Sequence, residues 1–291
     1  MHKYLLLLIS ILLSACATKA PPPSTSAAIT VVDGPATATE LNARYRDTPR
    51  NCGNDSRPAF LCSGVILRTT TYSDAYDSWD PSPNSLNKGS ISFSYLRKDN
   101  NFAAFGWKLT NGYVMYPILK APPDKLKVPI LCMFPMDGWT DGRLERQGCG
   151  IYGTIASSKA CHQLSVTTGA QWRANYPPGT QGSNICGFDV RDELNDYAGQ
   201  NFYAAMQAKW QDSRYFTEHN EMLLKVWSAG QGSVLPIQAF FYADAAGLAN
   251  ARKDKLRFLT KTRIDLPLIK ITLPAQPQGN ASFQYLAGDQ R

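Results

Sequence analysis

The sequence predicts an α+β fold, with strands dominating the first half of the chain and helices mixed with strands in the second. Short segments rich in β-branched and aromatic residues, bounded by Gly, Pro, Asn or Asp, recur from residue 63 onward. After residue 190 the apolar residues change to a spacing of four, which is typical of an amphipathic helix. Seven cysteines among the 291 residues indicate a disulfide framework.

Residues 1–16 are typical of an export signal, because a short basic start precedes an apolar stretch too short to span a bilayer. The stretch ends in LSAC, which resembles the bacterial lipobox, so we expect Cys16 to become the lipidated first residue of the mature protein. By resemblance to enterobacterial lipoproteins, Ala17 after the cysteine implies delivery to the outer membrane. The protein would then face the periplasm or the cell surface, or be released. The alternative is an ordinary secretory signal in which Cys16 is incidental.

The remaining chain divides into three predicted parts. Residues 17–39 are small, Pro-rich and nearly uncharged, and read as a flexible tether. Residues 40–274 show no internal linker or repeat and are expected to form a single domain. Residues 275–291 are expected to be a loosely ordered tail.

The net charge of the chain indicates which classes of partner to expect. It carries 30 basic and 23 acidic residues, or +7, and removing residues 1–16 takes away one lysine and no acid, which leaves +6. The basic residues are scattered, so nucleic-acid binding is not expected. A site for an anionic ligand stays open. Any membrane contact is expected to come from the lipid alone.

Six strands and three helices follow from the pattern. The predicted strands lie in 63–72, 90–97, 111–119, 127–135, 234–243 and 265–274. The predicted helices cover 190–210, 217–230 and 247–261. The second helix begins at Thr217, a good N-cap, and ends at Gly230, so it places Glu221 in its first turn.

Six cysteines remain after Cys16 and are predicted to pair in an oxidising compartment. Closeness along the chain favours Cys52 with Cys62, Cys132 with Cys149 and Cys161 with Cys186, among fifteen possible pairings. Zinc is the rival interpretation. No metal site is expected, because the sequence lacks CxxC and only His162 and His219 follow the signal.

Several strong catalytic signatures are missing: GxxxxGK, HExxH and GxSxG do not occur, and no GxGxxG follows a predicted strand. What remains is a spaced polar set, with Arg68 inside VILRTTTY, a serine strand in SISFSYLR, and Glu221 in HNEMLL. The serines at 90, 92 and 94 share one face by the period of two.

An arginine, a serine strand and a late glutamate resemble the pattern of mono-ADP-ribosyltransferases. More specifically, RPAFLCSGVILR, SWDPSPNS, SFSYLR, QGCG, CGFDVRD, NEMLLKVW and LPIQAFFY resemble the halovibrin family of secreted bacterial proteins. This resemblance covers nearly all of the chain beyond the tether. It implies the ADP-ribosyltransferase fold, NAD as a substrate rather than a permanently bound cofactor, and either hydrolysis of NAD or transfer of ADP-ribose to a protein acceptor.

The resemblance also implies roles. Glu221 would stabilise the positive charge that builds on the ribose, Arg68 would hold the pyrophosphate, and Ser92 would orient Glu221. Further candidates at the substrate site are Ser90, Ser94, Tyr72, Tyr76, Trp79, Phe93, Gln238 and His219. The aromatic ones would stack on nicotinamide.

The sequence also departs from the pattern. Arginine-modifying transferases usually carry a second acid two residues before the catalytic one, and here that residue is His219, which favours water as the acceptor. Glu218 is a weaker substitute for Glu221. Ser92 follows Arg68 by 24 residues, fewer than in many transferases. Its assignment is therefore wrong, or an insertion found elsewhere is missing.

Each candidate has a structural alternative. Glu221 in a first helical turn would stabilise the helix dipole, Arg68 would face solvent, the serines would line a polar outer face, and the aromatic residues would belong to the core. Two other functions stay open. One is a different hydrolase in which His219 is the base, oriented by Glu218 or Asp189. The other is a non-catalytic surface lipoprotein, such as an adhesion or inhibitor module.

Overall fold

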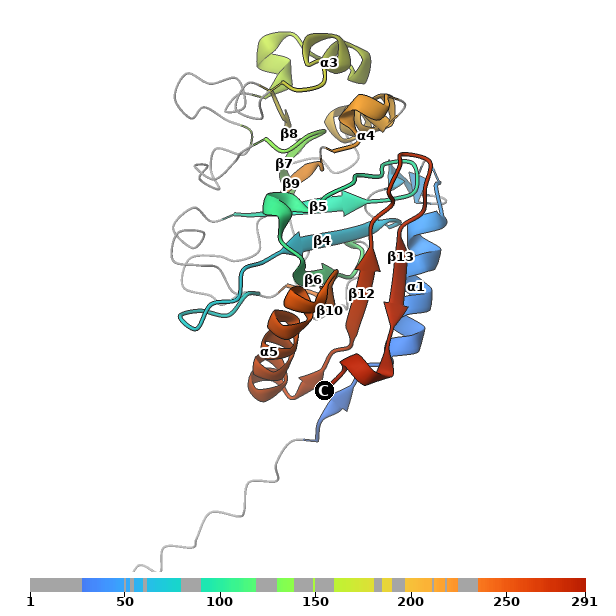
Figure 1. Cartoon of the computed structure of the whole chain (residues 1–291). Coiled ribbons are helices and arrows are strands. Elements are labelled where there is room, and N and C mark those ends of the chain that lie inside the picture. The colour runs from blue at the N-terminus through green and yellow to red at the C-terminus, as the bar shows by residue number, and fades with distance from the viewer. Residues whose placement is uncertain are drawn as a thin grey trace, which may run out of the picture.

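The protein has a mixed α/β architecture with one large mixed sheet (Figure 1). The computed structural model describes residues 28–49, 51–52, 55–59, 62–79, 90–118, 130–138, 149, 160–180, 185–189, 197–210, 212–217, 219–224 and 235–291. The helices in these ranges are α1 (Gly34–Arg46), α3 (Gly169–Asn175), α4 (Tyr197–Trp210) and α5 (Ala245–Thr262). None of the helices in this part of the chain is long and apolar enough to cross a bilayer.

Nine strands form the main sheet in the order β13-β12-β10-β6-β4-β5-β9-β7-β8. Their bounds are β4 Val65–Thr69, β5 Ile91–Leu96, β6 Asn111–Met115, β7 Ile130–Phe134, β8 Phe188–Asp189, β9 Glu221–Leu224, β10 Ile237–Tyr242, β12 Leu268–Thr272 and β13 Ser282–Tyr285. The β10–β12 pair is parallel, joined through α5, and the other pairs are antiparallel. Two small sheets pair β1 (Thr30–Val31) with β11 (Ile264–Asp265), and β2 (Asn51–Cys52) with β3 (Asp55–Pro58).

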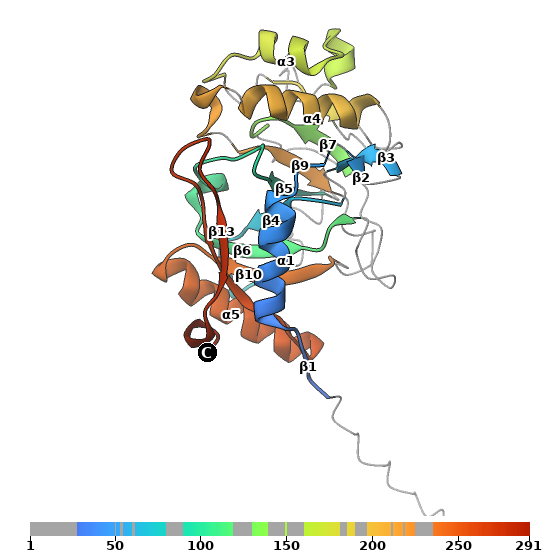
Figure 2. The same cartoon turned by 90° about the vertical axis from the view of Figure 1, so that its right-hand side faces the viewer.

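All six predicted strands are confirmed, and α5 confirms the predicted helix over 247–261. The apolar alternation in these strands supplies both faces of the sheet. Leu67, Val114 and Phe241 pack with α1 on one face, whereas Ile66 and Phe240 belong to the cluster on the α5 face. In Figure 2, α1 runs in front of β4, β6 and β10, and α5 lies behind them.

The helix predicted over 217–230 is wrong where the structure describes it. Residues Glu221–Leu224 form β9, a strand between β5 and β7 with every residue buried. A continuous apolar run of this length suits a strand buried on both faces as well as a helix, and the position between two strands decides for the strand. Thr217 therefore caps no helix. Residues 225–230 lie outside the described residues.

Both ends of the predicted domain differ from expectation. Helix α1 begins inside the predicted tether, because Asp33 caps it by accepting a hydrogen bond from the Ala36 N–H at 2.9 Å. Residues 17–27 and Cys16 lie outside the described residues. The C-terminal segment is not loose: β13 pairs with β12, and Phe283 is buried.

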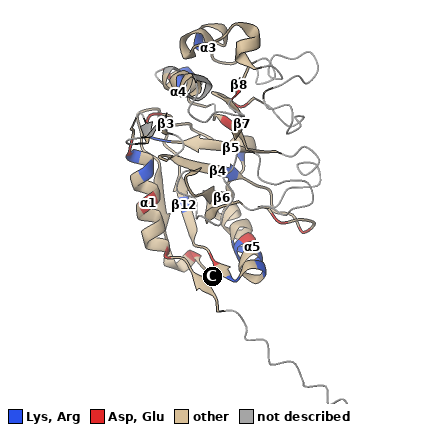
Figure 3. Cartoon of the chain, turned by 180° about the vertical axis from the view of Figure 1, so that it is seen from behind, with Lys and Arg blue, Asp and Glu red and all other residues tan. Residues whose placement is uncertain are grey.

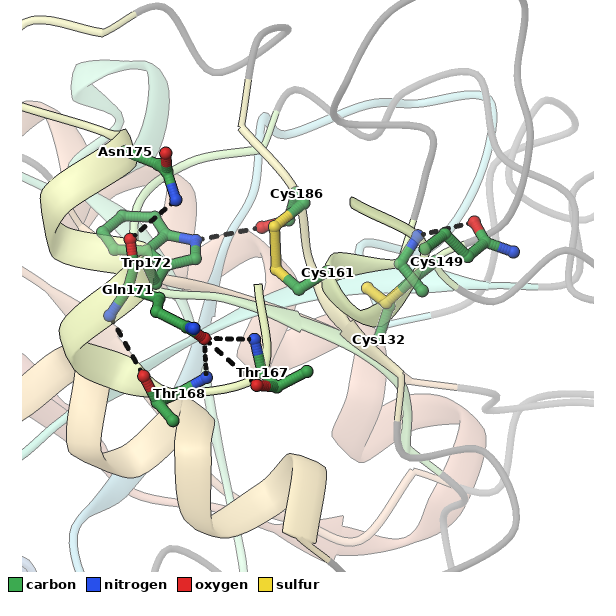
Figure 4. Close-up of a disulfide and its surroundings, with 11 residues drawn as sticks. Cys132, Cys149, Cys161, Thr167, Thr168, Gln171, Trp172, Asn175 and Cys186 are labelled. Atoms are coloured by element: carbon green, nitrogen blue, oxygen red, sulfur yellow. Dashed lines mark hydrogen bonds between the residues drawn. A yellow bond between two sulfur atoms is a disulfide. The ribbon is translucent and has the colours of Figure 1, made fainter. Parts of the chain in front are cut away.

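Helix α4 confirms the predicted helix from residue 197 onward, with Phe202 and Met206 fully buried. Residues 190–196 lie outside the described residues. Helix α3 was not predicted, although Thr168 and Gln171 form a capping box at its start (Figure 4). Figure 1 shows both helices over the β7–β8 end of the sheet.

The three predicted disulfides are confirmed: Cys52–Cys62, Cys132–Cys149 and Cys161–Cys186. The last two lie close together beside α3, where the Trp172 indole N–H donates to the Cys186 carbonyl at 3.1 Å (Figure 4). Closing loops of these lengths stabilises a fold by about 3 kcal/mol each in the chain-entropy model. Cys132–Cys149 and Cys161–Cys186 anchor the end of the main sheet at β8, which has only two residues.

A polar cluster fastens α5 to the segment that follows β4. Arg257 donates to the carbonyl groups of Ser73 at 2.7 Å and Tyr76 at 3.1 Å, and Lys261 pairs with the buried Asp77. Asp254 is 1% exposed in the same region, and burial raises the pKa of its carboxyl to about 6. Figure 3 shows both signs of charge along α5.

Candidate functional site

Arg68, Ser92 and Glu221 lie on three adjacent strands, β4, β5 and β9. Ser92 pairs with Leu223 and Phe93 with Met222, so the register places Ser94, rather than Ser92, opposite Glu221. Ser92, the predicted orienting residue, is therefore two pairs away from Glu221 along the strands. Ser90 is buried just before β5 begins.

The strands β4 and β5 part next to this position. Their pairing ends at Leu67 and Ser94, although β4 continues to Thr69 along β6 and β5 extends back to Ile91 along β9. The Arg68 Nη1 bridges the gap by donating to the Ser92 carbonyl oxygen at 2.7 Å. Arg68 thus binds the backbone of the serine strand.

The side chains of Arg68 and Glu221 leave the sheet on opposite faces. Arg68 pairs with Tyr113, whose ring lies 6.0 Å from that of Phe93 on the α5 face. Ser94 pairs with Leu67, on the α1 face, and Glu221 stands opposite Ser94. The structure therefore brings Glu221 together with the serines and leaves the Arg68 side chain on the other face.

Asn220 fixes the position of Glu221 along β5. Its side-chain amide accepts from the Tyr95 N–H at 2.8 Å and donates to the Tyr95 carbonyl at 2.7 Å, as a neighbouring strand would. Asn220 is fully buried, so this pair of hydrogen bonds is shielded from water. The register of the next residue, Glu221, is set by it.

Glu221 is a buried acid on a strand, and the alternative of a helix-terminus charge is wrong. The residue is 3% exposed, and its Oε2 accepts a hydrogen bond from the Gly138 N–H at 2.8 Å. Gly138 follows β7, whose Phe134 pairs with Glu221. A backbone donor at this distance holds the carboxylate in one orientation.

His219 lies close to Glu221, because both contact the segment that follows β7: Glu221 accepts from the Gly138 N–H, and His219 lies beside Asp137. Its Nε2 is 3.7 Å from the Asp137 Oδ2, so the acid beside it is Asp137. Burial lowers the pKa of His219; Asp137 opposes this shift, and Lys209 adds to it. The imidazole is therefore neutral near pH 7 and able to take up a proton. Glu218 lies outside the described residues.

A strained turn covers this side of the site. Trp107 (φ 56°) and Lys108 (φ 55°) are both left-handed, which costs about 1–2 kcal/mol for each residue with a side chain. Gly106 packs on His219, since a Cβ there would lie 3.1 Å from Nε2. The Trp107 side chain is 82% exposed. The sequence offered no signal for this turn.

The aromatic residues predicted to stack on nicotinamide lie elsewhere. Phe93 and Trp79 belong to the core, where Trp79 makes edge contacts with Phe240 and Phe258. The Tyr72 ring lies under Lys253 and Arg257 of α5, and Tyr76 accepts a hydrogen bond from Arg257 through its carbonyl.

Gln238 is remote from Glu221. Its Nε2 donates to Glu40 on α1 at 2.8 Å. Four strand spacings separate β10 from β9, or about 19 Å at the usual 4.8 Å. The prediction that Gln238 lines the same site as Glu221 is therefore wrong.

The chain matches no protein-family model and no curated protein sequence. Within the described ranges, no three His, Cys, Asp or Glu side chains lie close enough together to hold a metal ion. The case for a function therefore depends on the geometry around Glu221.

Proposed function

We propose that the protein cleaves NAD at the bond between nicotinamide and ribose, with Glu221 as the catalytic acid group. One observation carries the proposal: a glutamate that is almost fully buried on a strand is oriented by a backbone N–H, beside a serine strand and a neutral histidine. The resemblance to halovibrins supports the choice of NAD. The resemblance to a lipobox supports an exported protein with a lipid on Cys16.

The chemistry needs a group of this kind. Breaking the glycosidic bond of NAD builds positive charge on the ribose in an oxocarbenium-like transition state. A fixed carboxylate beside the ribose stabilises that charge, and one well-placed electrostatic group contributes about 3–4 kcal/mol. Ser94, opposite Glu221, is the nearest serine of the strand and takes the supporting role.

Water is the acceptor that the neighbouring residues favour. The neutral His219 takes a proton from water as it attacks the ribose, and the Asp137 carboxylate stabilises the resulting imidazolium. The products are then free nicotinamide and free ADP-ribose. Transfer of ADP-ribose to a protein acceptor would instead leave the label on that protein.

Arg68 receives a smaller role than the resemblance implies. Its guanidinium holds the serine strand through the Ser92 carbonyl, and its side chain leaves the sheet on the face opposite Glu221. We therefore assign it to positioning β5, and the pyrophosphate needs another cation.

The test is the release of nicotinamide from NAD by the purified protein. Glu221→Gln should lower the rate about a hundred- to a thousandfold. The melting temperature should change little, because the amide oxygen still accepts from the Gly138 N–H. Glu40→Gln, an exposed acid on α1, is the matched control and should retain full activity.

Two outcomes would contradict the proposal. Unchanged activity with a large loss of stability in Glu221→Gln would make Glu221 a structural residue. Absence of nicotinamide release by the wild-type protein would favour the non-catalytic binding module stapled by disulfides.

A further inference from the structure

The turn at Phe105–Lys108 combines a firm anchor with an exposed tip. Phe102 and Phe105 are buried, and the Ala103 N–H donates to the Phe216 carbonyl at 2.8 Å. The Thr69 hydroxyl donates a hydrogen bond to the Gly106 carbonyl at 3.4 Å. The tip that follows carries Trp107, the most exposed large apolar side chain in the described residues.

The turn is placed against the candidate site rather than elsewhere on the surface. Gly106 lies between His219 and Thr69, and a side chain at this position would crowd the imidazole at 3.1 Å. His219 precedes Glu221 by two residues, and the two side chains contact the neighbouring residues Asp137 and Gly138. The indole of Trp107 therefore projects from a backbone that touches the proposed water-activating residue.

Local physics favours other residues at the tip. Left-handed backbone suits Gly or Asn, and a bulky aromatic residue there is an outlier. An indole that is mostly exposed also gains little from burial. Strain of this kind at the edge of a site points toward a contact with a ligand.

We infer that this turn recognises the substrate, with the Trp107 indole stacking on a planar ring of NAD and Lys108 facing its phosphates. The inference rests on the proposed function. The turn would supply an aromatic ring and a cation in place of the predicted ones, because Phe93 and Trp79 are buried in the core and the Arg68 side chain lies on the opposite face of the sheet. Lys108 is exposed beside the indole, so a ring and a phosphate can bind next to each other.

Steady-state kinetics of nicotinamide release test the inference. Trp107→Ala should raise the KM for NAD roughly tenfold, the size expected for one lost stacking contact, and leave kcat nearly unchanged. Trp107→Phe should restore most of the affinity. Leu256→Ala on α5, which removes another exposed apolar side chain, should leave KM unchanged. An unchanged KM in Trp107→Ala overturns the inference.

Calorimetric binding to Glu221→Gln separates this inference from the proposed function. ADP-ribose should bind more weakly to Glu221→Gln/Trp107→Ala, and Lys108→Gln should weaken its binding and reduce the salt dependence. Nicotinamide mononucleotide and AMP identify the stacked ring, since only the one that carries it should lose affinity with Trp107. If the wild-type protein releases no nicotinamide but Trp107-dependent binding of ADP-ribose persists, the proposed function fails and the inference stands. If no nucleotide depends on Trp107, the inference fails.

A stability measurement supplies a readout that a structural role would reverse. Trp107→Gly relieves the left-handed strain, so its melting temperature should rise while its affinity for ADP-ribose falls. A fall in both would show that the indole supports the fold, which contradicts the inference.

Discussion

Glu221 and Asp254 are both buried acids, at 3% and 1% exposure, yet their surroundings differ. Asp254 lies on α5 among groups that fasten the helix to residues 72–79, where the cations Arg257 and Lys261 pair with Asp77. Glu221 lies on a central strand, where its Oε2 accepts a hydrogen bond from the Gly138 N–H.

The comparison shows that burial alone does not identify a catalytic acid. Around Asp254 the charged partners join two segments of the chain, which is a structural task. Around Glu221 the neighbours are a histidine whose pKa is lowered by burial, a serine strand and a strained turn with an exposed indole. These groups can act on a ligand. The proposal therefore rests on the residues that surround Glu221 and not on its burial.

The largest expected change in stability comes from Asp254→Asn. The folded carboxyl has a pKa of about 6, above its usual 3.8, so the folded state keeps a proton that the unfolded state has lost. Stability is therefore highest below about pH 4 and falls as pH rises to about 6. The shift corresponds to roughly 3 kcal/mol. Asp254→Asn should gain that amount above pH 6 and nothing near pH 4.

Denaturant unfolding of the wild type and of Asp254→Asn from pH 4 to pH 8 measures this difference in the free energy of unfolding. Nicotinamide release should stay at the wild-type rate. Asp47→Asn, an exposed acid at the end of α1, is the control and should show no gain. An activity loss in Asp254→Asn would erase the distinction between the two acids.

Asn220→Ala should cost about 2–3 kcal/mol of unfolding free energy, because it leaves a buried Tyr95 N–H without its acceptor. It should also lower kcat, since the position of Glu221 along β5 is no longer fixed. Asn42→Ala is the matched control: Asn42 likewise binds the backbone of Phe283 through its amide, far from the site. It should lose similar stability and retain kcat, and equal losses of kcat in both variants would refute a positioning role for Asn220.

Arg257→Met should have the smallest effect, a loss of about 1–2 kcal/mol, because partly exposed carbonyl groups can bind water instead of the guanidinium. The KM for NAD should not change if the contacts of Arg257 with residues 73–77 are purely structural. Thermal unfolding and nicotinamide release measure the two quantities. A raised KM would mean that the α5 face, including Arg68 and Tyr72, takes part in binding.

Much of the fold could be predicted because local sequence and local structure agree. Short runs of β-branched and aromatic residues in SISFSYLR and NGYVMYPIL, bounded by turn residues, predicted β5 and β6, and short separations predicted all three disulfides. Strand β9 could not be predicted, since Met222, Leu223 and Leu224 have no period of their own. Only the flanking strands β5 and β7 decide their conformation.

The site was predicted in part. Glu221 and the serines were found from a pattern of residue types, but the faces of β4 and β9 depend on pairing register, which removed the Arg68 side chain from the group. Asp137 and Trp107 were missed. Asp137 meets His219 only through the fold, and no turn residue in the sequence marks the left-handed backbone of Trp107.

The packing of α1 against β13 has a consequence for the order in which the chain folds. Asn42 and Phe283 are 241 residues apart, and α1 packs chiefly on this late strand. A growing or refolding chain can form the hairpins and the β10–α5–β12 unit long before that contact exists, because loops of such length close slowly. Until residues 282–285 arrive, the outer edge of β12 and the apolar side of α1 remain open to other chains.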